Sequence, residues 1–127
     1  QLMLRPFITI EKQTKQALEL YRSVFPSFRL KSVENHATPN NDYIMLAVFS
    51  IMNQDIMISD SLVSHEWSIT PGVSFFLNLE NVDEQHRIGE LLSENGKVHM
   101  PIGNYGFSKS FGWFEDQFGL NWQLNVE

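Results

Sequence analysis

The order of expected secondary-structure elements repeats once along the chain, and this repetition is the strongest constraint on the fold. Each half has the pattern of a strand, a helix and three further strands, with corresponding segments offset by about 66–69 residues. The 127 residues match the size of one ordinary domain. We therefore expect a single α+β domain, 1–127, with module one at 1–62, a connector at 61–72 and module two at 73–127.

The first half carries signals for all five elements. Thr14 is expected to cap a helix that ends before Pro26, because proline cannot continue the hydrogen-bond ladder. The inward face of this helix has helical spacing and consists of Ala17, Leu18, Tyr21, Val24 and Phe25. Strands are expected at Met3–Ile10, Phe28–His36, Tyr43–Ile51 and Asp55–Asp60.

The second half repeats this order and has its own signals for where helices and turns begin and end. Asn81 and Glu84 predict a capping box at the start of a helix, and Gly96 is expected to end that helix in the left-handed conformation. Asp116 is expected to brace the last turn through a bond from its side chain to the backbone. Strands are expected at Val73–Leu79, Lys97–Pro101, Ser110–Glu115 and Leu120–Val126.

Composition excludes several classes of chemistry. The chain has no cysteine, which rules out disulfides, thiolate metal sites and cysteine nucleophiles and fits a cytoplasmic setting. Its formal charge is −6, and its nine Lys and Arg residues form no basic stripe, so we expect no nucleic-acid partner. No apolar run approaches the roughly 20 residues of a membrane helix, and the first residues lack the apolar core of a signal peptide.

Strand alternation separates apolar faces, which should pack on the helices, from mixed faces, which should line a cavity. The mixed faces are neutral, polar and aromatic, and therefore suit an uncharged or weakly charged organic molecule. A second interpretation stays open, in which these polar side chains satisfy one another or face a partner subunit. The expected ligand-binding residues are Ser74, Phe76, Asn78, Gln123 and Asn125, with Met57, Trp113 and Trp67 in addition.

Titratable residues give little support to catalysis. Asp60 could be a base in a cavity or the cap of a strand end, and we favour the cap. Ser108 and Ser110 have no identifiable His–Asp partners for a hydrolase triad. No two histidines stand at a ligand spacing such as i, i+2 or i, i+4, so a histidine metal cluster is not expected; the four are His36, His65, His86 and His99.

The C-terminal segment resembles a known family. Met100–Trp113, followed by Asp116, Phe118-Gly119 and Trp122-Gln123-Leu124, is similar to the signature of PhnB-like proteins, which are often labelled demethylubiquinone methyltransferase-like. The resemblance extends to the first helix and the fourth strand, at Ala17, Tyr21, Phe25 and Ser59-Asp60. It implies the glyoxalase/bleomycin resistance/dioxygenase (vicinal oxygen chelate) fold, with two βαβββ modules curled around a cavity, in a homodimer.

The resemblance also implies where a metal would bind. Enzymes of this superfamily usually hold a divalent metal with four His, Glu or Gln side chains. These positions fall at Gln123, near Met57, near Ser74 and near Arg5–Phe7, and only the amide of Gln123 could serve as a ligand. We therefore expect no metal cofactor.

Three functions follow, and the sequence leaves open whether the protein is an enzyme. The first is a protein that binds a small organic molecule in a metal-free cavity. The alternative is a divalent-metal-dependent lyase, isomerase or dioxygenase with displaced ligands. The third is a structural role with a filled interior. The chain has no glycine-rich turn between a strand and a helix for a nucleotide-type cofactor.

Overall fold

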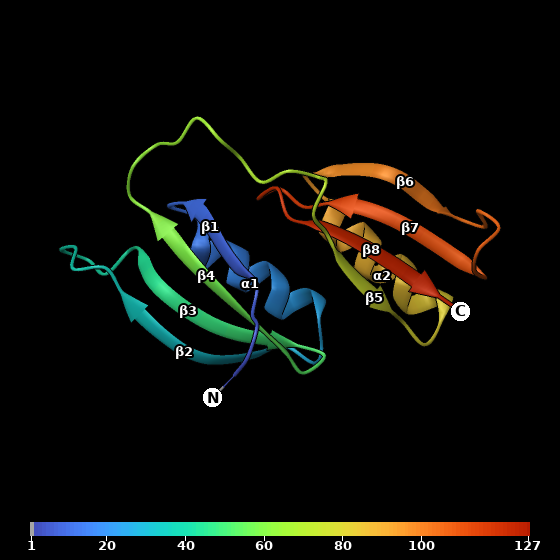
Figure 1. Ribbon diagram of the computed structural model, residues 1–127, viewed down its shortest axis with the longest axis horizontal. Helices are drawn as coiled ribbons and strands as arrows, with labels where there is room; N and C mark the ends of the chain where they lie inside the picture. The colour runs from blue at the N-terminus through green and yellow to red at the C-terminus, as the bar shows by residue number, and fades with distance from the viewer. Residues whose placement is uncertain (1) are drawn as a thin grey trace. The chain divides into compact units, whose positions relative to one another are not determined.

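The computed structural model describes residues 2–127, which divide into two compact units. Unit one ends at Glu66, and unit two runs from Trp67 to Glu127. Each unit contains one helix and one four-stranded mixed sheet (Figure 1). This confirms the expected α+β class with two βαβββ modules. Among residues 2–127, no helix is long and apolar enough to cross a membrane.

In unit one the sheet has the strand order β1-β4-β3-β2, in which β1 runs parallel to β4 and the other pairs are antiparallel. Met52 and Asn53 join β3 to β4, with φ angles of 51° and 66°. Two left-handed residues in a two-residue loop match the twist of the strands that they connect. The elements are β1 (Phe7–Glu11), α1 (Thr14–Val24), β2 (Arg29–Asn35), β3 (Ile44–Ile51) and β4 (Gln54–Ser61).

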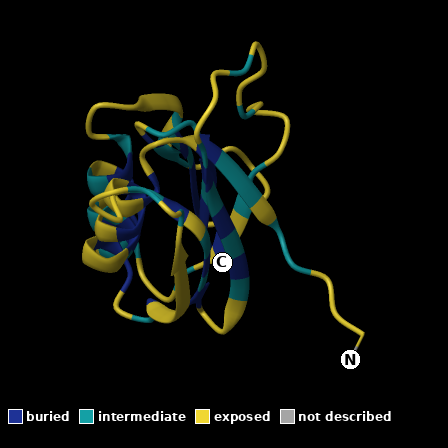
Figure 2. Ribbon diagram, turned by 90° about the vertical axis from the view of Figure 1, so that its left-hand side faces the viewer, coloured by how far each residue is buried: buried dark blue, intermediate teal, exposed yellow. Residues whose placement is uncertain are grey.

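Helix α1 buries the face that the sequence predicts. Ala17, Tyr21 and Val24 are completely buried, at positions separated by three and four residues. The ring of Tyr21 stacks on Phe49 of β3 with a centroid distance of 5.9 Å. The side of each helix that faces the strands is buried, whereas its outer side is exposed (Figure 2).

The start of α1 is capped by a side chain on strand β4. The residue before the helix, Gln13, makes no capping bond with its side chain, and Thr14 is the first helical residue rather than the cap. The carboxylate of Asp60 on β4 accepts hydrogen bonds from the backbone N–H of Thr14 (2.9 Å) and of Ile44 (2.8 Å). Asp60 is 3% exposed, and these contacts give it a structural role, although it caps the start of α1 and bonds to the start of β3 instead of capping the end of its own strand as expected.

Unit two repeats the architecture with the strand order β5-β8-β7-β6. Strand β5 runs parallel to β8, and the other pairs are antiparallel. The side chain of Asn81 caps the helix by accepting from the N–H of Glu84 (2.8 Å). The elements are β5 (Phe75–Asn78), α2 (Val82–Ser93), β6 (Lys97–Gly103), β7 (Ser110–Glu115) and β8 (Asn121–Val126).

Two details at the ends of α2 differ from the expectation. The carboxylate of Glu84 pairs with Arg87 (2.7 Å), so only the Asn81 half of the capping box is made. The left-handed residue after the helix is Asn95 (φ 60°) instead of Gly96. Gly96 has a different role, because a Cβ there would collide with the backbone oxygen of Glu115. The sequence correctly indicated a special role for Gly96, but the reason is the lack of room for a side chain and not a left-handed backbone.

The last turn of unit two is built on Asp116, as expected. One carboxylate oxygen of this buried residue accepts from the N–H groups of Phe118 (2.9 Å) and Leu120 (3.1 Å). The other accepts from the indole N–H of Trp122 (3.0 Å). Asp116 therefore fixes both the turn and a core tryptophan, and its role as a brace is confirmed.

Candidate ligand-binding site

The sheet of unit two presents its helix-free face as a polar and aromatic surface. On β8, Trp122 and Leu124 are buried in the core, and Gln123 and Asn125 alternate with them. The parallel register places Phe76 beside Gln123 and the neighbouring Asn78 beside Asn125. Period-2 alternation thus brings together the strand residues that the sequence predicts for the site.

The polar members of this face hydrogen-bond in pairs. The amide of Gln123 donates to the hydroxyl of Ser74 (2.7 Å), and the amide of Asn125 donates to the side-chain oxygen of Asn78 (2.8 Å). One of the two interpretations left open by the sequence was that these residues satisfy one another. The NH₂ group of Gln123 is paired in this way, but Asn125 is paired only through its NH₂ group.

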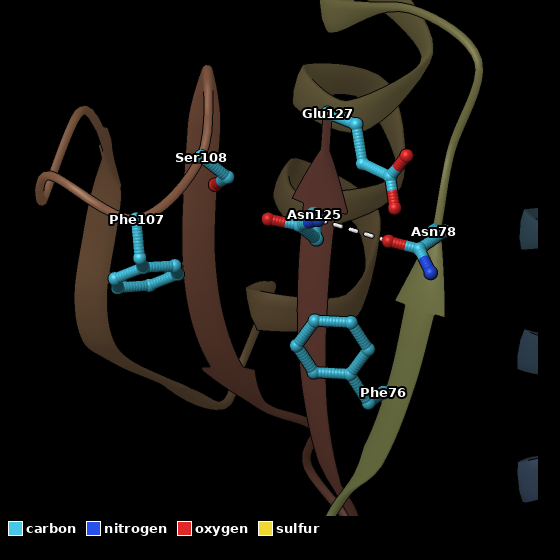
Figure 3. Close-up of a pocket in the computed structure, with 6 residues that line it drawn as sticks. All are labelled: Phe76, Asn78, Phe107, Ser108, Asn125 and Glu127. Atoms are coloured by element: carbon cyan, nitrogen blue, oxygen red, sulfur yellow. Dashed lines mark hydrogen bonds between the residues drawn. The ribbon is translucent and has the colours of Figure 1, made fainter.

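The oxygen of Asn125 is a buried acceptor without a donor among the described residues. Asn125 is 5% exposed, and its Oδ1 atom is buried with no hydrogen-bond partner in residues 2–127. Leaving such a group unpaired costs on the order of 1–3 kcal/mol. Figure 3 shows this oxygen directed away from Asn78, toward the side where Phe107 and Ser108 lie.

A pocket of about 500 Å³ opens beside this oxygen. Three of the predicted residues line it, together with three that the sequence did not indicate (Figure 3). The new ones are Phe107 and Ser108 in the β6–β7 connection and Glu127 after β8. No periodicity extends into these segments, so alternation could not assign their direction. The complete lining is Phe76, Asn78, Phe107, Ser108, Asn125 and Glu127.

An aromatic cluster forms one side of this pocket. Phe111 on β7 is buried, and its ring contacts Phe107 (centroids 5.0 Å apart) and Phe76 (6.3 Å). Tyr105 meets the same ring edge-on at 6.1 Å. Phe76 and Phe107 remain 55% and 63% exposed, so these two rings contact the buried Phe111 and still offer apolar surface to a ligand.

The other five predicted residues do not line this pocket: Ser74 and Gln123 bond to each other outside the lining, and three lie elsewhere. Trp113 on β7 donates its indole N–H to Asn121 (3.0 Å) and contacts the ring of His99, away from the residues that line the pocket. Trp67 is 57% exposed at the start of unit two and does not line this pocket. Met57 lies on β4 of unit one, where it is paired with Phe7.

A connected group of polar side chains surrounds Trp113. The imidazole of His99 lies 2.9 Å from a carboxylate oxygen of Glu115, and the amide of Asn121 reaches the same oxygen at 3.4 Å. The Trp113 and His99 rings are 4.9 Å apart.

The residues at the implied metal positions do not fit a divalent cation. The Nε2 group of Gln123 donates to Ser74, which leaves Oε1 as the one candidate ligand among these positions, whereas a catalytic site needs about three protein ligands; Met57 and Ser74 are not ligands of the type that Zn²⁺ or Fe²⁺ selects. Within residues 2–127, no three His, Asp or Glu side chains come together as a metal cluster. His36 and His65 are instead bonded to the backbone oxygen of Asp60 (2.9 Å) and to the hydroxyl of Ser61 (2.7 Å).

Comparisons with known proteins agree with this architecture. A solved structure from Bacillus cereus, described as a putative 3-demethylubiquinone-9 3-methyltransferase, PhnB protein, is 29% identical with a TM-score of 0.92. The match covers 99% of this chain and 100% of that one. A glyoxylase/bleomycin resistance protein/dioxygenase domain from Frankia is 9% identical with a TM-score of 0.69, over 99% and 91% of the two chains, which shows the shared glyoxalase fold.

Sequence relatives lead to the same family. Protein YjdN of Escherichia coli K12 is 34% identical over 76 residues, which are 60% of this chain and 51% of YjdN, so the match spans about half of that relative. The family model described as 3-demethylubiquinone-9 3-methyltransferase matches residues 3–125. The chain therefore belongs to this PhnB-like family, as the resemblance of its C-terminal segment indicated.

Proposed function

We propose that this protein binds a small organic molecule in the pocket between β5, β8 and the β6–β7 connection, without a metal ion. The observation that carries the proposal is the buried Asn125 oxygen, which has no donor among residues 2–127 and lies beside a pocket walled by aromatic rings. A ligand N–H or O–H at that oxygen would remove the cost of an unpaired buried acceptor.

The size and lining of the pocket support a small-molecule ligand. Sites for such ligands typically enclose about 300–1,000 Å³ and combine apolar walls with a few polar groups. This pocket measures about 500 Å³ and combines the rings of Phe76 and Phe107 with the amides of Asn78 and Asn125. A planar molecule could lie against the rings while the amides fix its orientation.

The family description names a methyltransferase that acts on a demethylubiquinone. We propose binding rather than methyl transfer for this chain. The chain has no glycine-rich turn from a strand into a helix, which is the element that binds a nucleotide-type cofactor, and the proposed pocket is lined by groups on strands and a loop. The flat quinone ring of a demethylubiquinone, which the family description names, could lie against the walls formed by Phe76 and Phe107.

The proposal can be tested by nuclear magnetic resonance on isotope-labelled, chelator-treated protein that carries no histidine tag. A set of planar aromatic amides, phenols and amines is added, and the shifts of the backbone and of the Asn and Gln side-chain NH₂ groups are followed. We expect saturable changes at Asn78 and Asn125. Saturable binding that perturbs neither residue would contradict the site.

The repeat supplies a matched control variant. Phe76 and Phe7 occupy equivalent positions in the parallel strand pairs, beside Gln123 and Met57, and they are 55% and 54% exposed. Replacing Phe76 with alanine should weaken binding about tenfold, since it removes one wall of the pocket. Phe7→Ala should leave the affinity within about twofold. Equal effects of the two substitutions would place the ligand elsewhere.

The metal-free part of the proposal has its own test. Mn²⁺, Ni²⁺ and Zn²⁺ are added in turn to chelator-treated protein, and anaerobic Fe²⁺ in a fourth series, while the midpoint of thermal unfolding is recorded. A metal that binds the native state raises this midpoint by mass action. We expect no saturable rise. A rise with one metal would instead favour the metal-dependent enzyme.

A further inference from the structure

The polar groups at the centre of the pocket are acceptors of hydrogen bonds. Asn125 uses its NH₂ group to donate to Asn78, which leaves Oδ1 as the group without a partner among the described residues. Asn78 turns its own NH₂ group away from Asn125 (Figure 3). The carboxylate of Glu127 is the charged group of the lining and is also an acceptor.

The aromatic walls favour the same kind of ligand. The faces of phenylalanine rings carry partial negative charge and attract cations within about 6 Å of their centroid. Phe107 and Phe76 both border the pocket, and Figure 3 shows Asn125 between Phe107 and the strand that carries Phe76 and Asn78. A flat cation could therefore stack on a ring and donate hydrogen bonds from its edge.

The charge of unit two points in the same direction. Residues 67–127 contain eight Asp and Glu residues but only three basic ones, Arg87, Lys97 and Lys109. None of these three lines the pocket, although Lys109 follows the lining residue Ser108 in the chain. An excess of one sign attracts ligands of the opposite sign and repels those of the same sign.

We propose that the ligand class of this pocket is a planar aromatic cation with N–H donors, such as an aryl amidinium, an aryl guanidinium or a protonated heteroaromatic amine. This inference rests on the proposed binding function and narrows it. The N–H groups bond to Oδ1 of Asn125, the positive charge lies near Glu127, and the ring packs on Phe76 or Phe107. It revises the sequence-based expectation of an uncharged or weakly charged ligand, because Glu127 was not among the predicted residues.

Access to the Asn125 oxygen requires a side chain to move. The atom is covered in the structure, whereas the neighbouring rings of Phe76 and Phe107 are more than half exposed. Side chains with that exposure change rotamer in picoseconds to nanoseconds. The proposal requires that rotation of one of these rings opens a path from the pocket to the oxygen.

Three molecules of the same shape test the ligand class: benzamidinium, benzamide and benzoate. They differ in charge and in hydrogen-bond donors, and each is titrated at low ionic strength while the shifts of the Asn78 and Asn125 side-chain amides are followed. We expect benzamidinium to bind about three- to tenfold more tightly than benzamide. Benzoate should not bind at this site.

Two charge-neutralising variants separate the role of Glu127 from the net charge of the protein. Glu127→Gln should reduce the preference for benzamidinium over benzamide to within about twofold and leave benzamide affinity unchanged. Glu94→Gln changes the net charge equally at the exposed C-terminal end of α2 and should keep the preference. Equal effects of the two variants would overturn the role of Glu127.

The outcomes distinguish this inference from the binding function. If benzamide or benzoate binds at Asn125 as tightly as benzamidinium does, the ligand class is wrong and the pocket still binds organic molecules. Tightest binding of benzoate would indicate that the amides of Asn78 and Asn125 are both turned around, so that Asn125 donates to the ligand. If neither these three molecules nor the wider aromatic set perturbs the pocket, both proposals fail.

Discussion

The carboxylate of Asp60 offers the sharpest test of how unit one is held together. Its two oxygens accept hydrogen bonds from the backbone N–H of Thr14 and of Ile44, at 2.9 and 2.8 Å. The first bond supplies the cap that Gln13 does not provide, and the second ties the start of β3 to β4. Asp60→Asn keeps the shape of the side chain and removes one of the two acceptors.

The size of the effect follows from the hydrogen bonds that are lost. An amide oxygen can still accept one of the two N–H groups, but the amide nitrogen then faces the other. A buried N–H group without an acceptor costs about 1–3 kcal/mol, and the lost negative charge at the helix start adds about 0.3–1 kcal/mol. We expect Asp60→Asn to lower the free energy of unfolding by about 2–3 kcal/mol, and Asp60→Ala by about 3–5 kcal/mol.

The measurement is urea unfolding followed by far-ultraviolet circular dichroism, with hydrogen exchange at the amides of α1. All three tryptophans lie in residues 67–127, so their fluorescence reports separately on unit two. Asp42→Asn is the control, because Asp42 is exposed, and a substitution there should change stability by less than about 0.5 kcal/mol. An Asp60→Asn protein within 0.5 kcal/mol of the unmodified one, with unchanged exchange in α1, would refute the capping role.

Two further predictions concern α2. Gly89→Ala should lower the free energy of unfolding by about 0.5–2 kcal/mol despite the higher helix propensity of alanine, because the new Cβ would lie 2.8 Å from the ring of the buried Phe114. The control is Gly72→Ala, where the nearest atom is 3.4 Å from the new Cβ. It should lower the free energy of unfolding by less in the same urea assay. The hydrogen bond from Arg87 lowers the pKa of Glu84 below 4.5, so this pair stabilises the fold above that pH and the contribution is lost as the pH falls through the folded-state pKa. Arg87→Gln should return the pKa of Glu84 toward its usual value in a carboxyl titration by nuclear magnetic resonance, with a stability change below about 0.5 kcal/mol because the pair is partly exposed.

The prediction of the site from the sequence depended mainly on strand alternation. It depends only on the pleat of the backbone, so it placed Phe76, Asn78 and Asn125 on one face before any tertiary contact was known. Phe107 and Ser108 lie outside the strands, where backbone direction depends on turn geometry instead of a period. Their contribution to the pocket could be identified only from the structure.

Helix ends were harder to predict than helix faces. The inward stripe of α1 follows from spacing along a single segment, as Tyr21 and Val24 show. The cap of α1 comes from Asp60, which is 46 residues away from Thr14 in the sequence. A local motif search cannot find a bond of this kind, and it therefore assigned the cap to Thr14 itself.

Comparison of the two units explains why the candidate site lies on unit two. The strand registers place Asp60 at the position equivalent to Val126, which is buried and apolar. Unit one needs an acidic side chain there to cap its helix, whereas unit two caps its helix locally with Asn81 and can bury a valine. The neighbouring outward position holds Ser59 in unit one and Asn125 in unit two. In unit one, the buried carboxylate of Asp60 therefore serves the structure. In unit two, the buried amide of Asn125 leaves an acceptor beside a pocket.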